Sequence, residues 1–303
     1  MNINMRDYPV VFLSYDEPNC EENWARVQRL IPSAIRVHGV KGSDRAHKRC
    51  AAEAGSASRF WTIDGDNWLL PDAVAYTAAV SEELDTGVEI YSHCSRNPVT
   101  GLIYGNGGAK LWPRSVVEHM HTHEAAEHSD AAIDFCWSLD YVLMPQVLTE
   151  TRSAETAQQA WRSAFRESVK FTQILGQPAL SVDDWRDRAA EINQHRLAAW
   201  LMVGMDHRQG LFSILGARQA QTWLWRDQGD WSRIEDFDYL DQLWRAKACD
   251  LTEAQARDII ATEGQWLDDQ GLPVKKEPLG RDHSRWFKRQ QMRDLRNQPR
   301  RLR

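Results

Sequence analysis

The sequence lacks the features that mark several classes of protein. No apolar run approaches the roughly 18 residues that a membrane-spanning helix needs, and the start, MNINMRDYPV, has no apolar stretch of the signal-peptide type. The five cysteines are scattered and never form a CxxC pair, which excludes a disulfide framework and a zinc knuckle. There is no internal repeat and no low-complexity linker. We therefore expect a protein of the cytoplasm, with reduced thiols and no membrane span.

Several catalytic motifs are missing as well. The segment HTHEAAEH resembles the zinc motif HExxH, but the second histidine, His128, comes one position too late. The glycine cluster GNGG has the spacing neither of a dinucleotide-binding GxGxxG nor of a phosphate-binding Walker loop. The segment DGDNW lacks the Thr or Val that aspartyl phosphatases carry two residues after the second Asp. These three enzyme classes are excluded.

What remains is the composition of an ordinary globular protein. Hydrophobic residues make up 42% and charged residues 26% of 303 residues, enough to bury a full core in one large domain or two smaller ones. The number of tryptophans, 14, is unusual, and eight of them follow Val182.

The net charge of -6 is unevenly distributed along the chain. Residues 281–303 hold nine Lys and Arg against two Asp, a net charge of +7, so the preceding 280 residues carry -13. A basic segment on an acidic protein is typical of binding to a polyanion such as a nucleic acid, because phosphates are held largely by charge neutralisation. A solvated tail without a partner is the alternative.

The first 63 residues alternate between apolar runs and amphipathic segments. Strands are predicted at 9–15, 35–40 and 59–63, with helices at 21–31 and 45–54 between them. This order predicts an α/β fold with a central, mostly parallel, Rossmann-like sheet flanked by helices.

The remainder of the chain is less regular. We expect strands at 88–92, 102–104 and within 133–144, and helices at 115–126, 156–175, 185–201, 210–218, 234–248 and 251–264. We assign residues 1–218 to a catalytic core and 219–303 to a helical extension that ends in the basic tail, 281–303.

The clearest candidate site is Asp64-Gly65-Asp66-Asn67, directly after the third predicted strand. Ligands of open α/β sheets bind at the carboxyl ends of the strands, and carboxylate oxygens are the protein ligands that Mg²⁺ and Mn²⁺ prefer. Asp64 and Asp66 are therefore candidate metal ligands, with Asp64 also near a bound nucleotide. A plain turn closed by Asx hydrogen bonds is the alternative.

Polar residues follow the first two predicted strands too. Ser14, Tyr15 and Asp16, with Glu17 next to them, offer a hydroxyl, a ring and carboxylates that could hold a ribose and a base. After the second strand come cations that could approach a base or a diphosphate: Lys41, Arg45 and Lys48. Ordinary loop polarity is the alternative for both groups.

In this order the motifs resemble the GT-A class of nucleotide-sugar glycosyltransferases. The resemblance is carried by VVFLSYDEPN, GSDRAHKRC, FWTIDGDN as an Asp-x-Asp signature, and RNPVTGLIYGNGGAKLWPR, over residues 8–218. It implies a GT-A-like fold, a UDP-sugar donor such as UDP-glucose that Gly107 and Gly108 help to line, and Mn²⁺ or Mg²⁺ held by Asp64 and Asp66. Such enzymes often add a downstream metal ligand, for which His207 is the candidate, with a surface histidine as the alternative.

An inverting transferase of this class also needs a carboxylate base for the acceptor hydroxyl. Asp134 in AIDFC fits this role by position, and Glu167 in AFRE is its rival. A retaining mechanism would need neither.

The acceptor is suggested by the tail, which interleaves aromatic and basic residues. The candidate nucleic-acid contacts are Arg285, Trp286, Lys288, Arg289 and Arg293. In size and motif order, the chain resembles the viral enzymes that glycosylate hydroxymethylated pyrimidines in DNA. This resemblance implies that DNA is the partner and that the modified base is flipped out or exposed. Two alternatives remain: a saccharide or lipid-linked acceptor, whose sugar rings the tryptophans would stack on, and a non-catalytic binding module.

Overall fold

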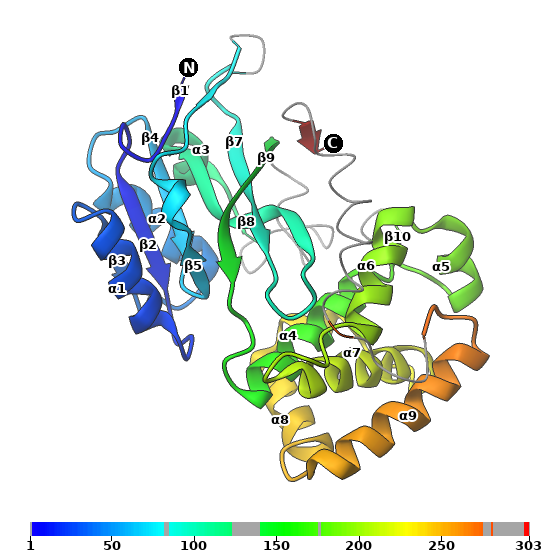
Figure 1. Cartoon of the computed structure of the whole chain (residues 1–303). Helices are drawn as coiled ribbons and strands as arrows, with labels where there is room; N and C mark the ends of the chain where they lie inside the picture. The colour runs from blue at the N-terminus through cyan, green and yellow to red at the C-terminus, as the bar shows by residue number, and fades with distance from the viewer. Residues whose placement is uncertain are drawn as a thin grey trace. The chain divides into compact units, whose positions relative to one another are not determined.

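The computed structural model describes residues 2–81, 85–122, 140–174, 177–274, 280 and 300–302. The chain divides into two compact units, each described by itself below (Figure 1). The first unit comprises Met1–Asn97, Ile103–Arg152 and Met292–Arg303, and the second comprises Pro98–Leu102 and Ser153–Gln291. These units divide the chain at Arg152, whereas the sequence analysis placed the end of the core at residue 218.

The first unit starts with the predicted alternation of strand and helix. Its elements lie within a few residues of the predicted bounds: β2 (Val10–Ser14), α1 (Cys20–Leu30), β3 (Ile35–His38), α2 (Ser43–Glu53) and β4 (Arg59–Asp64). β2 pairs in parallel with both β3 and β4, so β2 lies between them. The two helices are connections between parallel strands, as the alternation predicted.

The two helices cover opposite faces of these strands. Alternate residues of a strand point to opposite faces. Val27 of α1 packs in one core cluster with Phe12 of β2, while Cys50 of α2 packs in another with Val11. Both faces of the sheet are therefore buried, which explains why the strands are continuously apolar rather than alternating.

The rest of the sheet is formed by β5 (Asn67–Leu69), β7 (Ile90–Arg96), β8 (Ile103–Pro113), β9 (Tyr141–Thr151) and β12 (Arg300–Leu302). The strand order is β12-β9-β7-β8-β4-β2-β3, and β5 also pairs with β9. Four of the seven pairings described in this sheet are antiparallel, so the expectation of a mostly parallel sheet is wrong. One physical reason is that β7 joins β8 through a short loop, which allows only an antiparallel pair there.

The first unit also contains smaller elements at its rim. These are β1 (Asn2–Ile3), which pairs with β6 (Ala78–Ala79), the short helix η1 (Pro71–Ala73), and α3 (Arg114–His119). α3 is shorter than the predicted helix at 115–126, whose last residues, from 123 on, lie outside the described part of the chain. Most of the predicted strand region at 133–144 also lies outside it.

The second unit is mainly helical, as predicted, and runs from green to orange in Figure 1. Its elements are α4 (Ala157–Lys170), the hairpin of β10 (Gln173–Ile174) and β11 (Gln177–Pro178), α5 (Val182–Arg188), α6 (Glu191–Met202), α7 (Gly210–Trp225), η5 (Trp231–Glu235), α8 (Phe237–Lys247) and α9 (Glu253–Asp269). Nearly all of α7 is buried. Gly216 lets α7 approach α4, because a Cβ there would lie 2.3 Å from the carbonyl oxygen of Trp161.

The excess of tryptophan after Val182 is largely a matter of core packing. Four of these side chains are less than a tenth exposed: Trp185, Trp200, Trp223 and Trp244. Truncating a buried tryptophan typically costs about 3–5 kcal/mol. These four rings are therefore unavailable for stacking on sugars, which removes much of the sequence support for the saccharide alternative.

None of the helices in the described part of the chain is long and apolar enough to cross a membrane. The cysteines for which the structure gives a state, Cys20, Cys50, Cys94 and Cys249, are all free thiols.

Candidate functional site

The connectivity of β2, β3 and β4 creates one distinctive edge of the sheet. From β2 the chain passes through α1 to β3 on one side, and from β3 it passes through α2 to β4 on the other side of β2. In open α/β sheets, a reversal of this kind leaves a crevice outside the carboxyl ends of the strands, where ligands bind. We call the residues at this edge, Ser14–Glu17, His38 and Asp64–Asn67, the switch-point edge.

Carboxylates from β2 and β4 meet at the switch-point edge. The Glu17 carboxylate accepts a hydrogen bond from the Tyr15 N–H at 2.8 Å. A Cβ on Gly65 would lie 2.5 Å from Glu17 Oε2, so the carboxylate rests directly on the turn that joins Asp64 to Asp66. Only glycine leaves this space. The acidic residues that follow β2 and β4 in the sequence thus lie close together in space.

The clustering of these acids affects their protonation. Burial raises the pKa of Asp66 to about 7, and the charges of Asp64 and Glu17 contribute to the rise. Burial also raises the pKa of Glu17, against the opposing effect of the Tyr15 N–H. The carboxylates therefore destabilise one another's charged forms, a situation that a bound cation would relieve.

A lysine lies beside the acids. Lys110 Nζ is 3.8 Å from Asp64 Oδ2 and donates a hydrogen bond to the Gly107 carbonyl at 2.7 Å. Its side chain is 12% exposed and that of Asp64 is 40% exposed. The Asp64 carboxylate is therefore more exposed than the Lys110 side chain, and the ion pair between them is loose.

The acidic groups fit a divalent cation only in part. Within the described ranges, no group of three or more His, Cys, Asp and Glu side chains converges closely enough to hold a metal ion. Mg²⁺ is commonly bound by one or two carboxylates and completes its shell with water and substrate phosphates. The donor set of Asp64 and Asp66 fits that second arrangement, in which oxygens from outside the protein complete the shell.

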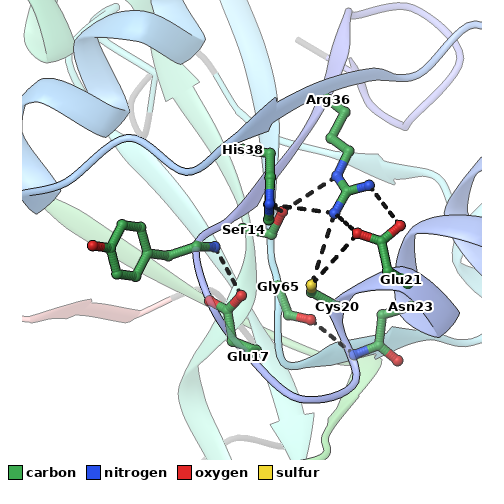
Figure 2. A network of polar contacts seen from close by, with 9 residues as sticks. Ser14, Glu17, Cys20, Glu21, Asn23, Arg36, His38 and Gly65 are labelled. Atoms are coloured by element: carbon green, nitrogen blue, oxygen red, sulfur yellow. Dashed lines mark hydrogen bonds and ion pairs between the residues drawn. The ribbon is translucent and has the colours of Figure 1, made fainter.

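A polar network lies next to the acids, at the ends of β2 and β3 (Figure 2). Arg36 makes two hydrogen bonds to the Glu21 carboxylate, at 2.8 and 2.5 Å, and its Nε lies 3.4 Å from Ser14 Oγ. Ser14 Oγ is 3.0 Å from His38 Nδ1, and Arg36 Nη2 is 3.3 Å from the same nitrogen. Asn23 joins α1 to the acidic turn by donating to the Gly65 carbonyl at 2.8 Å.

This network fixes the tautomer of His38. A guanidinium can only donate hydrogen bonds, so the His38 Nδ1 that faces Arg36 must be the acceptor. Ser14 then accepts from Arg36 and donates to the same nitrogen. His38 is exposed, and its remaining nitrogen, Nε2, carries the proton. The ring therefore offers a hydrogen-bond donor suited to a carbonyl or phosphate oxygen.

The other predicted nucleotide-binding residues are distributed around this edge. Tyr15 and Asp16 are exposed directly after β2, and Lys41 and Arg45 are exposed between β3 and the first turn of α2. Lys48 forms an ion pair with Asp44 at 2.9 Å. All follow carboxyl ends of neighbouring parallel strands, as expected; their contact with a nucleotide stays a prediction.

The two predicted glycines are buried within the sheet. A Cβ on Gly107 would lie 2.4 Å from the His93 carbonyl oxygen, and a Cβ on Gly108 would lie 2.2 Å from Asn67 Nδ2. Their immediate role is to allow close packing of neighbouring groups. Contact with a donor nucleotide stays a prediction for both.

The remaining candidates belong to the second unit or lie outside the described residues. Glu167 is on α4, and His207 follows α6; both belong to the second unit. His207 Nδ1 accepts a hydrogen bond from the Gln209 N–H at 3.2 Å. The candidate base Asp134 and the tail residues lie outside the described residues: Arg285, Trp286, Lys288, Arg289 and Arg293.

The sequence analysis missed three residues of this site. Arg36 and His38 alternate on β3, so the period of a strand places both on one face, a signal that could have been used. Lys110 carried no such signal, because its approach to Asp64 depends on the pairing of β4 with β8.

Comparison with known proteins finds one distantly similar solved structure and no family. No protein-family model and no curated protein matches the sequence. A solved structure described as that of a glycosyltransferase involved in the glycosylation of the major capsid of PBCV-1 is similar at 14% identity, with a TM-score of 0.24. The match covers 36% of this chain and 62% of that chain, less than two thirds of its length.

Proposed function

We propose that the protein is a glycosyltransferase that uses a nucleoside diphosphate sugar. The observation that carries this proposal is the convergence of Glu17, Asp64 and Asp66 at the switch-point edge. Beside them, Ser14, Arg36 and His38 form a polar network with an outward donor on His38. An acidic group next to hydrogen-bond donors suits a diphosphate that arrives with its cation and carries a base and a ribose.

Asp64 and Asp66 would hold Mn²⁺ or Mg²⁺ together with the diphosphate of the donor. When bound, the cation would neutralise charge on the leaving nucleoside diphosphate. The first turn of α2 begins at the same edge, and the free N–H groups of a helix N-terminus favour phosphate. Lys110, beside Asp64, adds a positive charge.

In the reaction, the oxygen of an acceptor hydroxyl forms a bond to the anomeric carbon of the sugar. The bond from that carbon to the phosphate oxygen breaks, and the nucleoside diphosphate leaves with the electron pair. The hydroxyl proton passes to a base. Asp134 and Glu167 are the candidates for the base if the configuration is inverted, and His207 is a candidate for a further metal ligand.

We propose UDP-glucose as the donor and a 5-hydroxymethylpyrimidine in DNA as the acceptor. A His38 donor is compatible with a uracil carbonyl oxygen. The net charge of +7 on residues 281–303 supports a polyanionic acceptor.

The first experiment tests the enzyme. UDP release from UDP-glucose is measured with and without Mn²⁺ for the wild type, Asp66→Asn, and Ser232→Ala as a control far from the acids in sequence. The proposal expects Mn²⁺-dependent release that Asp66→Asn lowers by at least about 100-fold at an unchanged melting temperature. Equal activity of Asp66→Asn and wild type would exclude the assignment of Asp66.

The second experiment tests the acceptor. Hydroxymethylated DNA is incubated with the protein and a panel of nucleotide sugars, and its nucleosides are analysed by mass spectrometry. A hexose added to the hydroxymethylpyrimidine supports the DNA proposal. If glycosyl transfer occurs only to saccharide or lipid-linked acceptors, the DNA acceptor is wrong and the transferase proposal stands.

A further inference from the structure

Asn67, the residue after the second aspartate, lies on β5 and is enclosed by residues of β7, β8 and β9. Its side chain is 2% exposed. Its amide nitrogen donates a hydrogen bond to Asp66 Oδ1 at 2.7 Å. On the other side, its carbonyl oxygen accepts from Ser95 Oγ at 3.1 Å and from Thr151 Oγ1 at 3.3 Å. The amide thus connects the Asp66 carboxylate to hydroxyl groups of β7 and β9.

The orientation of this amide follows from its neighbours. The ionised form of the Asp66 carboxylate can only accept hydrogen bonds, so in that form the group of Asn67 that faces it must be the NH₂. Hydroxyl groups can donate, so Ser95 and Thr151 complement the carbonyl end. These two hydroxyls lie 2.7 Å apart, and the Thr149 carbonyl, 3.2 Å from Ser95 Oγ, is a second acceptor for the single Ser95 proton. The amide therefore has one orientation that satisfies both of its ends.

The surrounding backbone fits the amide closely. Asn67 pairs with Thr151 in the ladder between β5 and β9. On β8, a Cβ at Gly108 would lie 2.2 Å from Asn67 Nδ2, so only glycine leaves room for the amide there. The main chain of Asp66 is held as well, because its carbonyl accepts the Arg152 N–H at 2.7 Å.

We propose that Asn67 is a positioning residue for the donor site, which holds the Asp66 carboxylate through Oδ1 and leaves Oδ2 as the oxygen for a cation. This inference rests on the proposed function. In this inference, Gly108 leaves space for the Asn67 amide, and Ser95 and Thr151 orient the amide by hydrogen bonds. Residues hydrogen-bonded to a metal ligand commonly change metal affinity about 10- to 100-fold when they are replaced.

The test compares Mn²⁺ binding in the presence of UDP, by calorimetry, among matched variants. Asn67→Ser removes the amide, and Gly108→Ala displaces it while keeping Asn67. Thr62→Val is the control, because it removes a buried hydrogen bond on β4, from Trp112 Nε1 to Thr62 Oγ1 at 2.8 Å, that involves neither Asp66 nor Asn67. Melting temperatures are measured for all of them.

The inference expects the two variants of the amide pocket to bind Mn²⁺ at least about tenfold more weakly, while Thr62→Val binds like the wild type. Wild-type affinity in either folded variant of the pocket would overturn it and leave the proposed function intact. If one variant does not fold, the other decides.

If the wild type itself binds no Mn²⁺ with UDP, the metal part of the proposed function fails. The positioning role is then decided by crystal structures of the wild type and Asn67→Ser. An Asp66 carboxylate that turns away in the variant supports the inference, and one that keeps its orientation overturns it.

Discussion

His93 makes a strong prediction about stability at acid pH. It lies on β7 with no exposed surface, packed against the rings of Trp61 and Tyr76 at centroid distances of 5.1 and 5.3 Å. Neither ring nitrogen has a hydrogen-bond partner of ordinary geometry among the described residues. Burial lowers the pKa of His93 from 6.5 to about 3, and the backbone at Tyr91 and Ala109 offsets only a part of this effect.

The sign and size of the effect follow from proton linkage. Between pH 6.5 and about 3 the unfolded chain binds a proton at His93 that the folded chain does not, so the free energy of unfolding falls as the pH falls. Above pH 6.5 the group contributes no pH dependence. From pH 8 to pH 5 the loss amounts to about 2 kcal/mol, a large part of a typical total stability of roughly 5–15 kcal/mol.

The perturbation that tests this is His93→Phe, which keeps an aromatic ring between the neighbouring rings and removes the titration. Urea unfolding of wild type and variant at pH 8 and pH 5 gives the free energies. The variant is expected to gain about 2 kcal/mol relative to wild type at pH 5 compared with pH 8, whatever its packing cost at both pH values. Ile63→Val, a change in the core cluster that contains Trp61, is the control and shifts both values equally, by about 1 kcal/mol. A difference between His93→Phe and wild type that is the same at both pH values would refute the reasoning.

Three further predictions concern single side chains. Gly264→Ala should destabilise the second unit by roughly 2–3 kcal/mol in urea unfolding, because its Cβ would lie 2.1 Å from Nη1 of the buried Arg218; an unchanged midpoint would contradict this packing. Burial raises the pKa of Glu263 from 4.5 to about 7, so its contribution to stability is present below pH 4.5 and is lost as the pH rises through 7. Glu263→Gln should therefore be about 3 kcal/mol more stable relative to wild type at pH 8 than at pH 4.5, and an equal difference at both would refute the shift. Gly65→Ala should displace Glu17 and lower kcat of sugar transfer by the folded protein roughly 10- to 100-fold; a fully active variant would show that the position of Glu17 is not critical.

The parts of the fold that the sequence predicted well depend on local patterns. β2, α1, β3, α2 and β4 lie where apolar runs and helical periodicity placed them. Their order implies parallel pairing, and parallel pairing brings their carboxyl ends together. For this reason the neighbourhood of Ser14 and Asp64 could be anticipated from sequence alone.

The remaining features depend on pairings between distant segments, which local patterns do not specify. β5 has only three residues, and it is a strand because β9 pairs with it. The enclosure of Asn67 requires Ser95, Gly108 and Thr151 at the same place. The sequence did not indicate that Gly108 is buried against Asn67, because that contact depends on the distant pairing of the strands.

The most direct test of the account is a measurement of sugar transfer from UDP-glucose with Mn²⁺ by the wild type and by Asp64→Asn, followed as UDP release together with the mass of the modified acceptor. The account predicts Mn²⁺-dependent transfer by the wild type and its loss in Asp64→Asn, with both proteins folded. Transfer by Asp64→Asn at the wild-type rate would contradict the claim that the switch-point edge is the catalytic centre.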